Sequence, residues 1–441
     1  MVNIKGGLAS AGTRDLTVGL HSFHTWRSMK DTLAINGGPK AKTTPYGTGL
    51  RYTGNERKYL DEALTSNTLF YGFGKFVKRA CEMMQTYTGR PHAVACSSGS
   101  AAIHLGLIAS GIGPGDEVIV TPNTDFGSLI GIIAEGAVPV FCDCDWTLQP
   151  SAATVAAKIT PRTRAVVVIH LAGFPAPVDE IVALCAPRGI GVVEDCAQSW
   201  GTRLHGRLVG SFGTAGCFST NDFKHISTGD GGFVVLNDPA LYRRVNNYSD
   251  KHYDRLFDGS LAGAHFGMNY RMTELQGAVA VAQLEQVDAI TARHHELGER
   301  LTAQLHDLPG AKILQPIAGG YSTYWWTTLV VDESAVGVSR DELVKALRAE
   351  GLNANSYGKY ERIQSGLMQT RVVRPWLTDA RRQYPFVQPD GRSYEYNLAD
   401  APTHQCILAA GIMIGLGRFY SDRDIDETAA GIHKVFAAYK K

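Results

Sequence analysis

Residues 117–142 read EVIVTPNTDFGSLIGIIAEGAVPVFC, and this stretch decides the fold. It begins with a β-rich run at 117–121, continues as a helical pattern at 126–135, and returns to a β-rich run at 137–142. Both β-rich runs are nearly continuous Val and Ile, which is typical of strands covered by helices on both faces of a sheet. The stretch therefore predicts a strand–helix–strand unit, the building block of a parallel sheet.

The same alternation continues along the chain, with predicted helices at 151–159 and 178–187 and predicted strands at 165–170 and 191–194. At 272–306 the pattern becomes one long helical run that ends before a Pro-Gly pair, as expected of a helix that bridges two domains. We therefore predict an α/β fold. A large domain at 33–285 carries a mostly parallel central sheet, a smaller α+β C-terminal domain occupies 286–441, and residues 1–32 form an N-terminal extension.

Composition narrows the class of partner. The 43 Lys and Arg residues and the 42 Asp and Glu residues nearly cancel, so the chain lacks the basic bias of a protein that binds nucleic acid or anionic membranes. No apolar stretch approaches the roughly 20 residues that a membrane helix needs. We expect small-molecule substrates and other copies of the same chain as partners.

The eight cysteines show neither a disulfide framework nor a CxxC pair, and the 14 histidines show no HExxH motif. This usage favours a reducing cytoplasm and predicts no metal site.

Three segments carry candidate chemistry. At Ser97-Ser98-Gly99-Ser100 small residues follow a strand and open a helix, which favours an anion site at the helix N-terminus, although a plain N-cap is the alternative. Asp195 ends a buried strand, where open α/β sheets bind ligands, although it would serve equally as the cap of a helix. Lys224 lies between two strands; such a lysine is usually a solvated surface group, but beside a carboxylate and a phosphate site it can form a Schiff base.

The order of these segments resembles the DegT-type family of fold-type-I aminotransferases, which depend on pyridoxal phosphate (PLP) and act on keto sugars and aminocyclitols. The resemblance runs from Leu33 to the C-terminus. It rests on the blocks LAINGG (33–38), SGSAAIHL (98–105), GPGDEVIV (113–120), HLAG (170–173), EDCAQ (194–198), FS (218–219) with Lys224, GDGG (229–232) and NYRMTEL (269–275).

The resemblance implies catalytic roles for two residues. Lys224 would hold PLP as a Schiff base and move the proton between the substrate carbon and the cofactor. Asp195 would keep the ring nitrogen of PLP protonated, and Gln198 would lie by its phenolic oxygen.

The resemblance also implies how the phosphate of PLP is held. The backbone of Ser100 and Ala101 and the hydroxyl of Ser219 would bind it within one subunit. Asn269 would reach it from the neighbouring subunit, which makes the active site a property of a homodimer.

One block departs from the family pattern. Many members place an aromatic residue directly after the threonine of the strand-end block, where it stacks on the cofactor ring. This chain has Asp125 in that place and Phe126 one position later. We expect Phe126 to be the cofactor contact, the alternative being that another side chain covers the ring. Asp125 is either a substrate residue or the N-cap of the following helix. Two further substrate candidates are His170 and Arg271, the latter serving either the substrate or the subunit interface.

The resulting expectation is an aminotransferase that takes an amino group from glutamate or glutamine and delivers it to a keto sugar, with nucleotide-linked sugars favoured, or to a keto cyclitol. The alternatives are another PLP reaction on the same scaffold (a lyase, a dehydratase or oxidative chemistry) and a non-catalytic protein that kept only the fold.

Overall fold

The computed structural model describes residues 33–256, 266–358 and 384–439, so the predicted extension at 1–32 lies outside the described residues. The central sheet of the first domain has the strand order β1-β9-β8-β5-β4-β2-β3. Its strands are β1 (His92–Cys96), β2 (Glu117–Val120), β3 (Val138–Phe141), β4 (Thr163–Ile169), β5 (Gly191–Asp195), β8 (Ala215–Ser219) and β9 (Gly232–Leu236).

The strands β3, β2, β4, β5 and β8 run parallel, and only β9 is antiparallel to both of its neighbours. This confirms the predicted α/β class with a mostly parallel sheet. The pairing sets Asp195 beside Ile169 on one side and beside Cys217 on the other. The residues that follow β4, β5 and β8 therefore meet at the carboxyl edge of the sheet.

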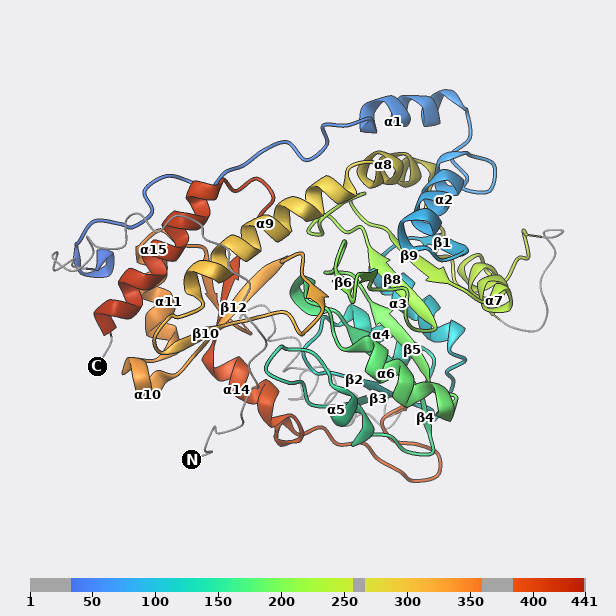
Figure 1. The fold of residues 1–441 in the computed structure, drawn as a ribbon. Coiled ribbons are helices and arrows are strands. Elements are labelled where there is room, and N and C mark those ends of the chain that lie inside the picture. Colours follow the sequence, from blue (N-terminus) through green and yellow to red (C-terminus); the bar gives the residue numbers. More distant parts are fainter. Residues whose placement is uncertain (1–32, 257–265, 359–383, 440–441) are drawn as a thin grey trace.

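Helices cover both faces of this sheet (Figure 1). One face packs against α3 (Gly99–Ala109), α4 (Gly127–Ala134) and α7 (Pro239–Ser249). The other face packs against α5 (Ala152–Ala156) and α6 (Val178–Cys185), and toward β1 and β9 against α1 (Glu56–Thr65), α2 (Phe76–Thr88) and α8 (Glu274–Leu284). In β9 the side chains alternate between these cores, because Phe233 and Val235 face one side and Val234 and Leu236 the other.

The long helix predicted at 272–306 is in fact two helices, α8 and α9 (Val287–Leu305). The ladder is interrupted at Gln286, whose φ and ψ are −112° and −2°. The preceding Glu285 accepts hydrogen bonds from Tyr59 and Arg79, so tertiary contacts fix the bend. No proline or glycine marks the break, which is why the sequence pattern did not reveal it.

The second domain is built on an antiparallel sheet of order β10-β12-β14-β13, and Figure 1 shows α9 running from the first domain alongside it. Its elements are β10 (Ala311–Ile313), β12 (Trp326–Val331), α10 (Glu333–Val336), α11 (Arg340–Ala349), β13 (Ala354–Ser356), α14 (Pro402–Ala410), β14 (Gly411–Gly415) and α15 (Asp422–Tyr439). A small third sheet joins β11 (Gly320–Tyr321) to β6 (Arg203–Leu204) and β7 (Arg207–Leu208). Short 3-10 turns lie at Ala34–Asn36, Leu171–Gly173, Ala186–Arg188 and Leu398–Asp400.

The second domain has its own hydrophobic core, which contains side chains of α9, α11 and α15. Leu33 belongs to this core, and the N–H groups of Ala34 and Ala41 donate to the Glu350 carboxylate. The first residues of the predicted large domain thus pack on the second domain, and the boundary at 285/286 stays a prediction.

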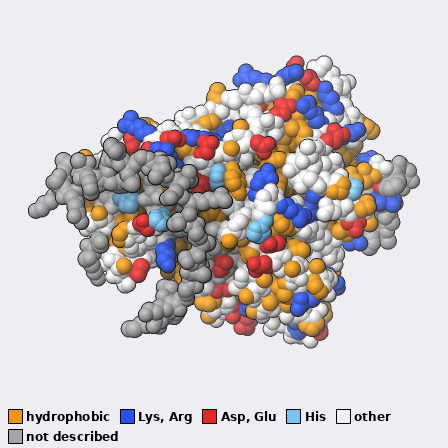
Figure 2. Space-filling view, viewed as in Figure 1, with side chains coloured by type: hydrophobic (Ala, Val, Ile, Leu, Met, Phe, Trp, Pro, Cys, Tyr) orange, Lys and Arg blue, Asp and Glu red, His pale blue; other side chains and the backbone are white. Residues whose placement is uncertain are grey.

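Surface charge follows the balanced composition. On the face seen in Figure 2, basic and acidic side chains are interspersed. Among the helices of the described residues, none is long and apolar enough to cross a membrane.

Candidate active site

The N-terminus of α3 forms one wall of the site. The Ser98 hydroxyl caps the helix by accepting from the Ala101 N–H at 3.1 Å. The N–H groups of Gly99 and Ser100 have no hydrogen-bond partner among the described residues. They are therefore the free donors of this helix end. The predicted backbone contact of Ala101 with a phosphate would have to share its N–H with Ser98.

Gly99 brings this helix end against β8. A Cβ atom at position 99 would lie 2.5 Å from the Ser219 Cβ and 2.7 Å from its Oγ, so only glycine allows the approach. The Ser219 hydroxyl therefore lies beside the free N–H groups of α3. Backbone donors at a helix N-terminus with an adjacent hydroxyl fit a phosphate group, as the sequence predicted.

Asp195 lies at the carboxyl end of β5 with 5% of its surface exposed. Its carboxylate accepts the Ala197 N–H at 3.0 Å and the Ser128 hydroxyl at 2.7 Å. Burial raises the pKa of Asp195 above its ordinary value, while these two hydrogen bonds and the charge of Lys224 oppose the rise. Two acceptor positions of the carboxylate are left for a ligand that brings a proton, such as a protonated ring nitrogen.

Lys224 projects from the turn after β8 toward Asp195 and the second domain. Burial lowers the pKa of its amine, and the charges of Asp195 and Asp125 oppose this. The Nζ atom lies 4.4 Å from the centre of the Trp325 ring, and the indole N–H of Trp325 donates to the Phe223 carbonyl at 2.9 Å. The second domain thus fixes a ring over the amine, and the lowering of its pKa favours the nucleophilic neutral form.

Asp125 and Phe126 form the block that departs from the family pattern, and the charge of Asp125 acts on the Lys224 amine. Asp125 is exposed, and its carboxylate accepts the Gly127 N–H at 2.8 Å at the start of α4. The N-cap residue of α4 is Phe126, so the predicted N-cap at Asp125 is wrong by one position, although the Asp125 carboxylate accepts the N–H of the first helical residue. Phe126 is partly buried and packs against the core of the first domain. Gln198 is tied to the turn after β4, because its carbonyl accepts the Ala172 N–H at 2.8 Å.

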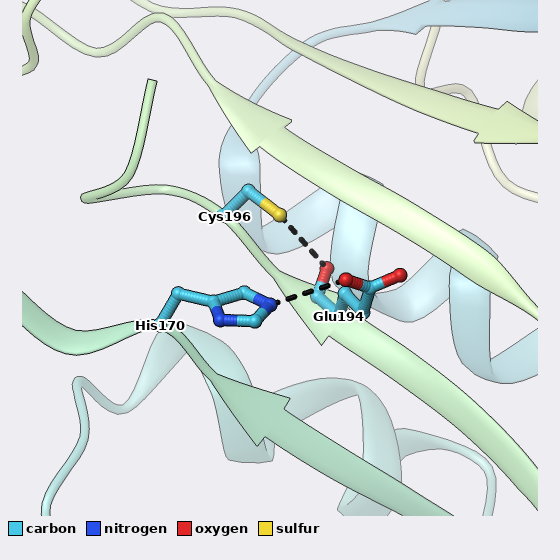
Figure 3. A group of neighbouring side chains, drawn as sticks. All are labelled: His170, Glu194 and Cys196. Carbon is cyan, nitrogen blue, oxygen red and sulfur yellow. Dashed lines mark hydrogen bonds and ion pairs between the residues drawn. The ribbon is translucent and has the colours of Figure 1, made fainter. Parts of the chain in front are cut away.

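His170, a predicted substrate residue, is enclosed by protein. Its Nδ1 accepts the Ala176 N–H at 3.0 Å, so Nε2 carries the proton and donates to Glu194 at 3.2 Å (Figure 3). The Cys196 thiol donates weakly to the Glu194 carbonyl, and burial raises its pKa well above the ordinary value. These three groups have the composition of a metal site, but the histidine nitrogen that faces the carboxylate carries a proton. The geometry favours a structural role for His170 over the predicted contact with substrate.

Asn269 and Arg271 belong to the segment that pairs with Asp250 and Cys96. Asn269 is exposed on the isolated subunit. Arg271 forms an ion pair with the buried Asp250 carboxylate, which also accepts the Tyr71 hydroxyl at 2.8 Å. Arg271 lines a cleft of about 650 Å³ whose walls include neither Lys224 nor Asp195. Within one subunit, Arg271 is therefore a wall residue of this cleft.

The chain's own residues fit PLP part by part. The free N–H groups of α3 and the Ser219 hydroxyl suit its phosphate, Asp195 suits its ring nitrogen, and Lys224 suits its aldehyde. Fold and site together define a PLP-dependent transferase of fold type I. The chain belongs to the DegT/DnrJ/EryC1/StrS aminotransferase family, whose model matches residues 51–371.

The relatives agree with this assignment. The chain is 34% identical over 385 residues to a GDP-perosamine synthase of Escherichia coli O157:H7, which covers 84% of this chain and 97% of that protein. It is 35% identical over 312 residues to a GDP-perosamine synthase of Caulobacter vibrioides, covering 69% and 81% of the two chains. Among solved structures, the aminotransferase from Psychrobacter cryohalolentis is 26% identical with a TM-score of 0.76 over 90% of this chain and 100% of that one.

Two contacts of the site were not foreseen from the sequence. Trp325 comes from a different domain than Lys224, and no local pattern links them. The other contact is that of Ser128 with Asp195. The spacing of four residues between Thr124 and Ser128 indicates that these two hydroxyls face each other, but it does not indicate the contact with Asp195.

Proposed function

We propose that this PLP-dependent sugar aminotransferase takes the amino group of glutamate or glutamine and delivers it to a nucleotide-linked keto sugar. The observation that carries the proposal is the pair of the partly buried Lys224 and the buried Asp195 beside the free N-terminus of α3, in a chain that aligns with nearly all of a GDP-perosamine synthase. Since those relatives are named for a GDP-linked amino sugar, a GDP-linked keto sugar is the first acceptor to test. The net reaction exchanges the amino group of the donor for the carbonyl oxygen of the acceptor.

The chain's residues divide the work. PLP, when bound, supplies an electron-withdrawing ring that accepts the electron pair left as the substrate C–H bond breaks. The Lys224 amine is the group that takes and returns that proton, because its lowered pKa leaves more of it neutral at pH 7. Asp195 holds positive charge on the ring nitrogen from a site that water hardly reaches. Trp325 covers the amine from the second domain.

The decisive experiment is the absorption spectrum of the purified protein with and without PLP, followed by addition of glutamate or glutamine. We expect a yellow band that borohydride fixes on Lys224, bleaching by an amino donor, and release of one equivalent of keto acid. Lys224→Ala should lack the band, whereas Lys345→Ala, which changes an exposed lysine of α11, should keep it. A band that no donor bleaches would favour the lyase or oxidative alternative, and absence of a band with excess PLP would contradict the proposal.

The acceptor is identified in the second half-reaction. Enzyme loaded with the amino group and freed of donor is mixed with a GDP-linked keto sugar, a dTDP-linked keto sugar or a keto cyclitol. Return of the yellow band with one equivalent of amino product identifies the acceptor. Turnover with the cyclitol alone would contradict the nucleotide-sugar assignment.

We further propose that the active enzyme is a homodimer in the cytoplasm. Asn269 is exposed and can therefore contact the phosphate site of a partner subunit, which supports the dimer. The eight unpaired cysteines suit a reducing compartment. Mixed dimers of Lys224→Ala and Asn269→Ala subunits test the shared site, because each mixed dimer would contain one site with neither change. Recovered activity in the mixture supports the proposal, and no recovery despite dimer exchange contradicts it.

A further inference from the structure

A buried chain of two hydroxyl groups ends on the Asp195 carboxylate. The Thr124 and Ser128 hydroxyls lie 2.6 Å apart, and the Ser128 hydroxyl lies 2.7 Å from Asp195 Oδ2. The exposed fractions of Thr124 and Ser128 are 1% and 2%, so water does not complete these bonds. Both hydroxyls come from the block that departs from the family pattern.

The direction of the bonds follows from the number of protons. An ionised carboxylate only accepts, so the single Ser128 proton points at Asp195. The Thr124 proton then points at the Ser128 oxygen. A hydroxyl that itself accepts a hydrogen bond is a stronger donor, so Thr124 strengthens the bond that Ser128 makes to the carboxylate.

We propose that Ser128, supported by Thr124, is a positioning residue that orients Asp195 and keeps it ionised toward the ring nitrogen of the cofactor. The inference rests on the PLP-dependent activity proposed above. The block that departs from the family pattern at Asp125 thus acts through two buried side chains, Thr124 and Ser128.

Asp195 needs such a donor. Burial raises its pKa and the charge of Asp125 raises it further, whereas the Ala197 and Ser128 hydrogen bonds and the charge of Lys224 lower it. The Ala197 bond belongs to the turn after β5, and the Lys224 nitrogen, once linked to the cofactor, loses its positive charge above the midpoint of the cofactor titration. Ser128 is then the side-chain donor that remains on the carboxylate.

The simpler explanation is that Ser128 only satisfies buried polar groups at the start of α4. That role would make Ser128→Ala less stable without changing the titration of the bound cofactor. The two explanations therefore differ in a spectroscopic property of the holoenzyme, independent of its turnover.

The experiment is a pH titration of the visible PLP band in the holoenzyme, with the wild type, Ser128→Ala, Ser128→Thr and Thr124→Val. In Ser128→Ala the carboxylate becomes more basic and draws the proton from the ring. The ring is then less cationic, so the Lys224 nitrogen, once linked to the cofactor, keeps its proton to higher pH. We expect the midpoint to rise by about one pH unit and kcat to fall about tenfold.

The other variants complete the test. Ser128→Thr keeps the hydroxyl and should titrate like the wild type, and Thr124→Val should shift the midpoint in the same direction but less. Ser110→Ala removes a hydroxyl bonded at the far end of α3 and should shift nothing. An unchanged midpoint in both Ser128→Ala and Thr124→Val would overturn the inference while leaving the PLP band, and hence the proposed function, intact. If Ser128→Ala does not fold, Thr124→Val decides alone.

Discussion

Glu194 and Asp195 are neighbours in β5, yet their carboxylates lie on opposite sides of the strand and differ in the number of hydrogen bonds they accept. Glu194 accepts three backbone N–H groups, from Gly210 at 2.6 Å and from Phe212 and Gly213 at 2.7 Å. It also accepts from His170 and lies 3.9 Å from the Arg90 guanidinium. Asp195 receives two hydrogen bonds.

The difference appears in their pKa values. Burial acts to raise both. For Glu194 the His170 hydrogen bond, the nearby charges and the backbone donors outweigh burial, and the pKa lies below its ordinary value of 4.5. For Asp195 burial prevails, and the pKa lies above 3.8. A carboxylate whose acceptor positions are filled by backbone holds a fold together, whereas one with spare positions is available to a ligand.

The largest effect is expected from Asp195→Asn. The amide cannot hold a positive charge on the ring nitrogen, so kcat should fall about 150- to 5000-fold, the rate equivalent of the roughly 3–5 kcal/mol of an uncompensated buried charge. The free energy of unfolding should stay near the wild-type value, because a desolvated charge has been removed. Parallel kinetics and denaturant titrations check this. A loss of stability as large as the loss of rate would place Asp195 with Glu194 as a structural residue.

Glu194→Gln is expected to show the converse. Its amide can accept fewer of the backbone N–H groups and leaves Arg90 without its counter-charge, so the free energy of unfolding should fall by about 3 kcal/mol. The folded fraction should keep a PLP band like that of the wild type. Glu296→Gln, an exposed change in α9, should alter the stability by less than about 0.5 kcal/mol. A Glu194→Gln protein of normal stability but shifted band would reverse the assignment of the two carboxylates.

The same comparison shows how far the sequence reached. The strand ends, the small-residue turn before α3 and the position of Lys224 follow from local patterns, because periodicity and turn chemistry are properties of short segments. The bond from Ser128 to Asp195 joins residues 67 positions apart, and the Trp325 ring reaches Lys224 from another domain. Such contacts depend on how α4 and β12 are docked, which no local pattern specifies. The pairing of His170 with Glu194 is likewise a contact between distant segments, and for that reason the sequence predicted a substrate contact for His170 instead.

The acid dependence of stability should separate the two carboxylates by sign. Glu194 has a lowered pKa, so its stabilisation is present above pH 4.5 and is lost as the pH falls through its folded value. Asp195 has a raised pKa, so its contribution is present below pH 3.8 and is lost as the pH rises through its folded value. In PLP-free protein, the advantage of wild type over Glu194→Gln should shrink on acidification, and that over Asp195→Asn should grow. Each slope is at most about 1.4 kcal/mol per pH unit. Denaturant midpoints between pH 3.5 and 7 measure both, and slopes of equal sign would contradict the comparison.

Asp125 is, with Asp195, a carboxylate whose charge acts on the Lys224 amine, and the smallest effect is expected from its replacement. Asp125→Asn keeps an oxygen to accept the Gly127 N–H, so this contact with the first turn of α4 survives, while Asp125→Ala loses the hydrogen bond and should lower the free energy of unfolding by about 1 kcal/mol. The negative charge of Asp125 raises the pKa values of Lys224 and Asp195, so its removal should move the acid limb of the rate profile to lower pH. Because Asp125 is exposed, solvent and salt screen this influence, and kcat should change by less than about threefold. If Asp125→Asn instead lost more than tenfold in kcat while binding PLP normally, the exposed carboxylate would be moving a proton itself. The division between a structural Glu194 and a catalytic Asp195 would then be incomplete, because the chemistry would also use Asp125, an exposed carboxylate with acceptor positions to spare.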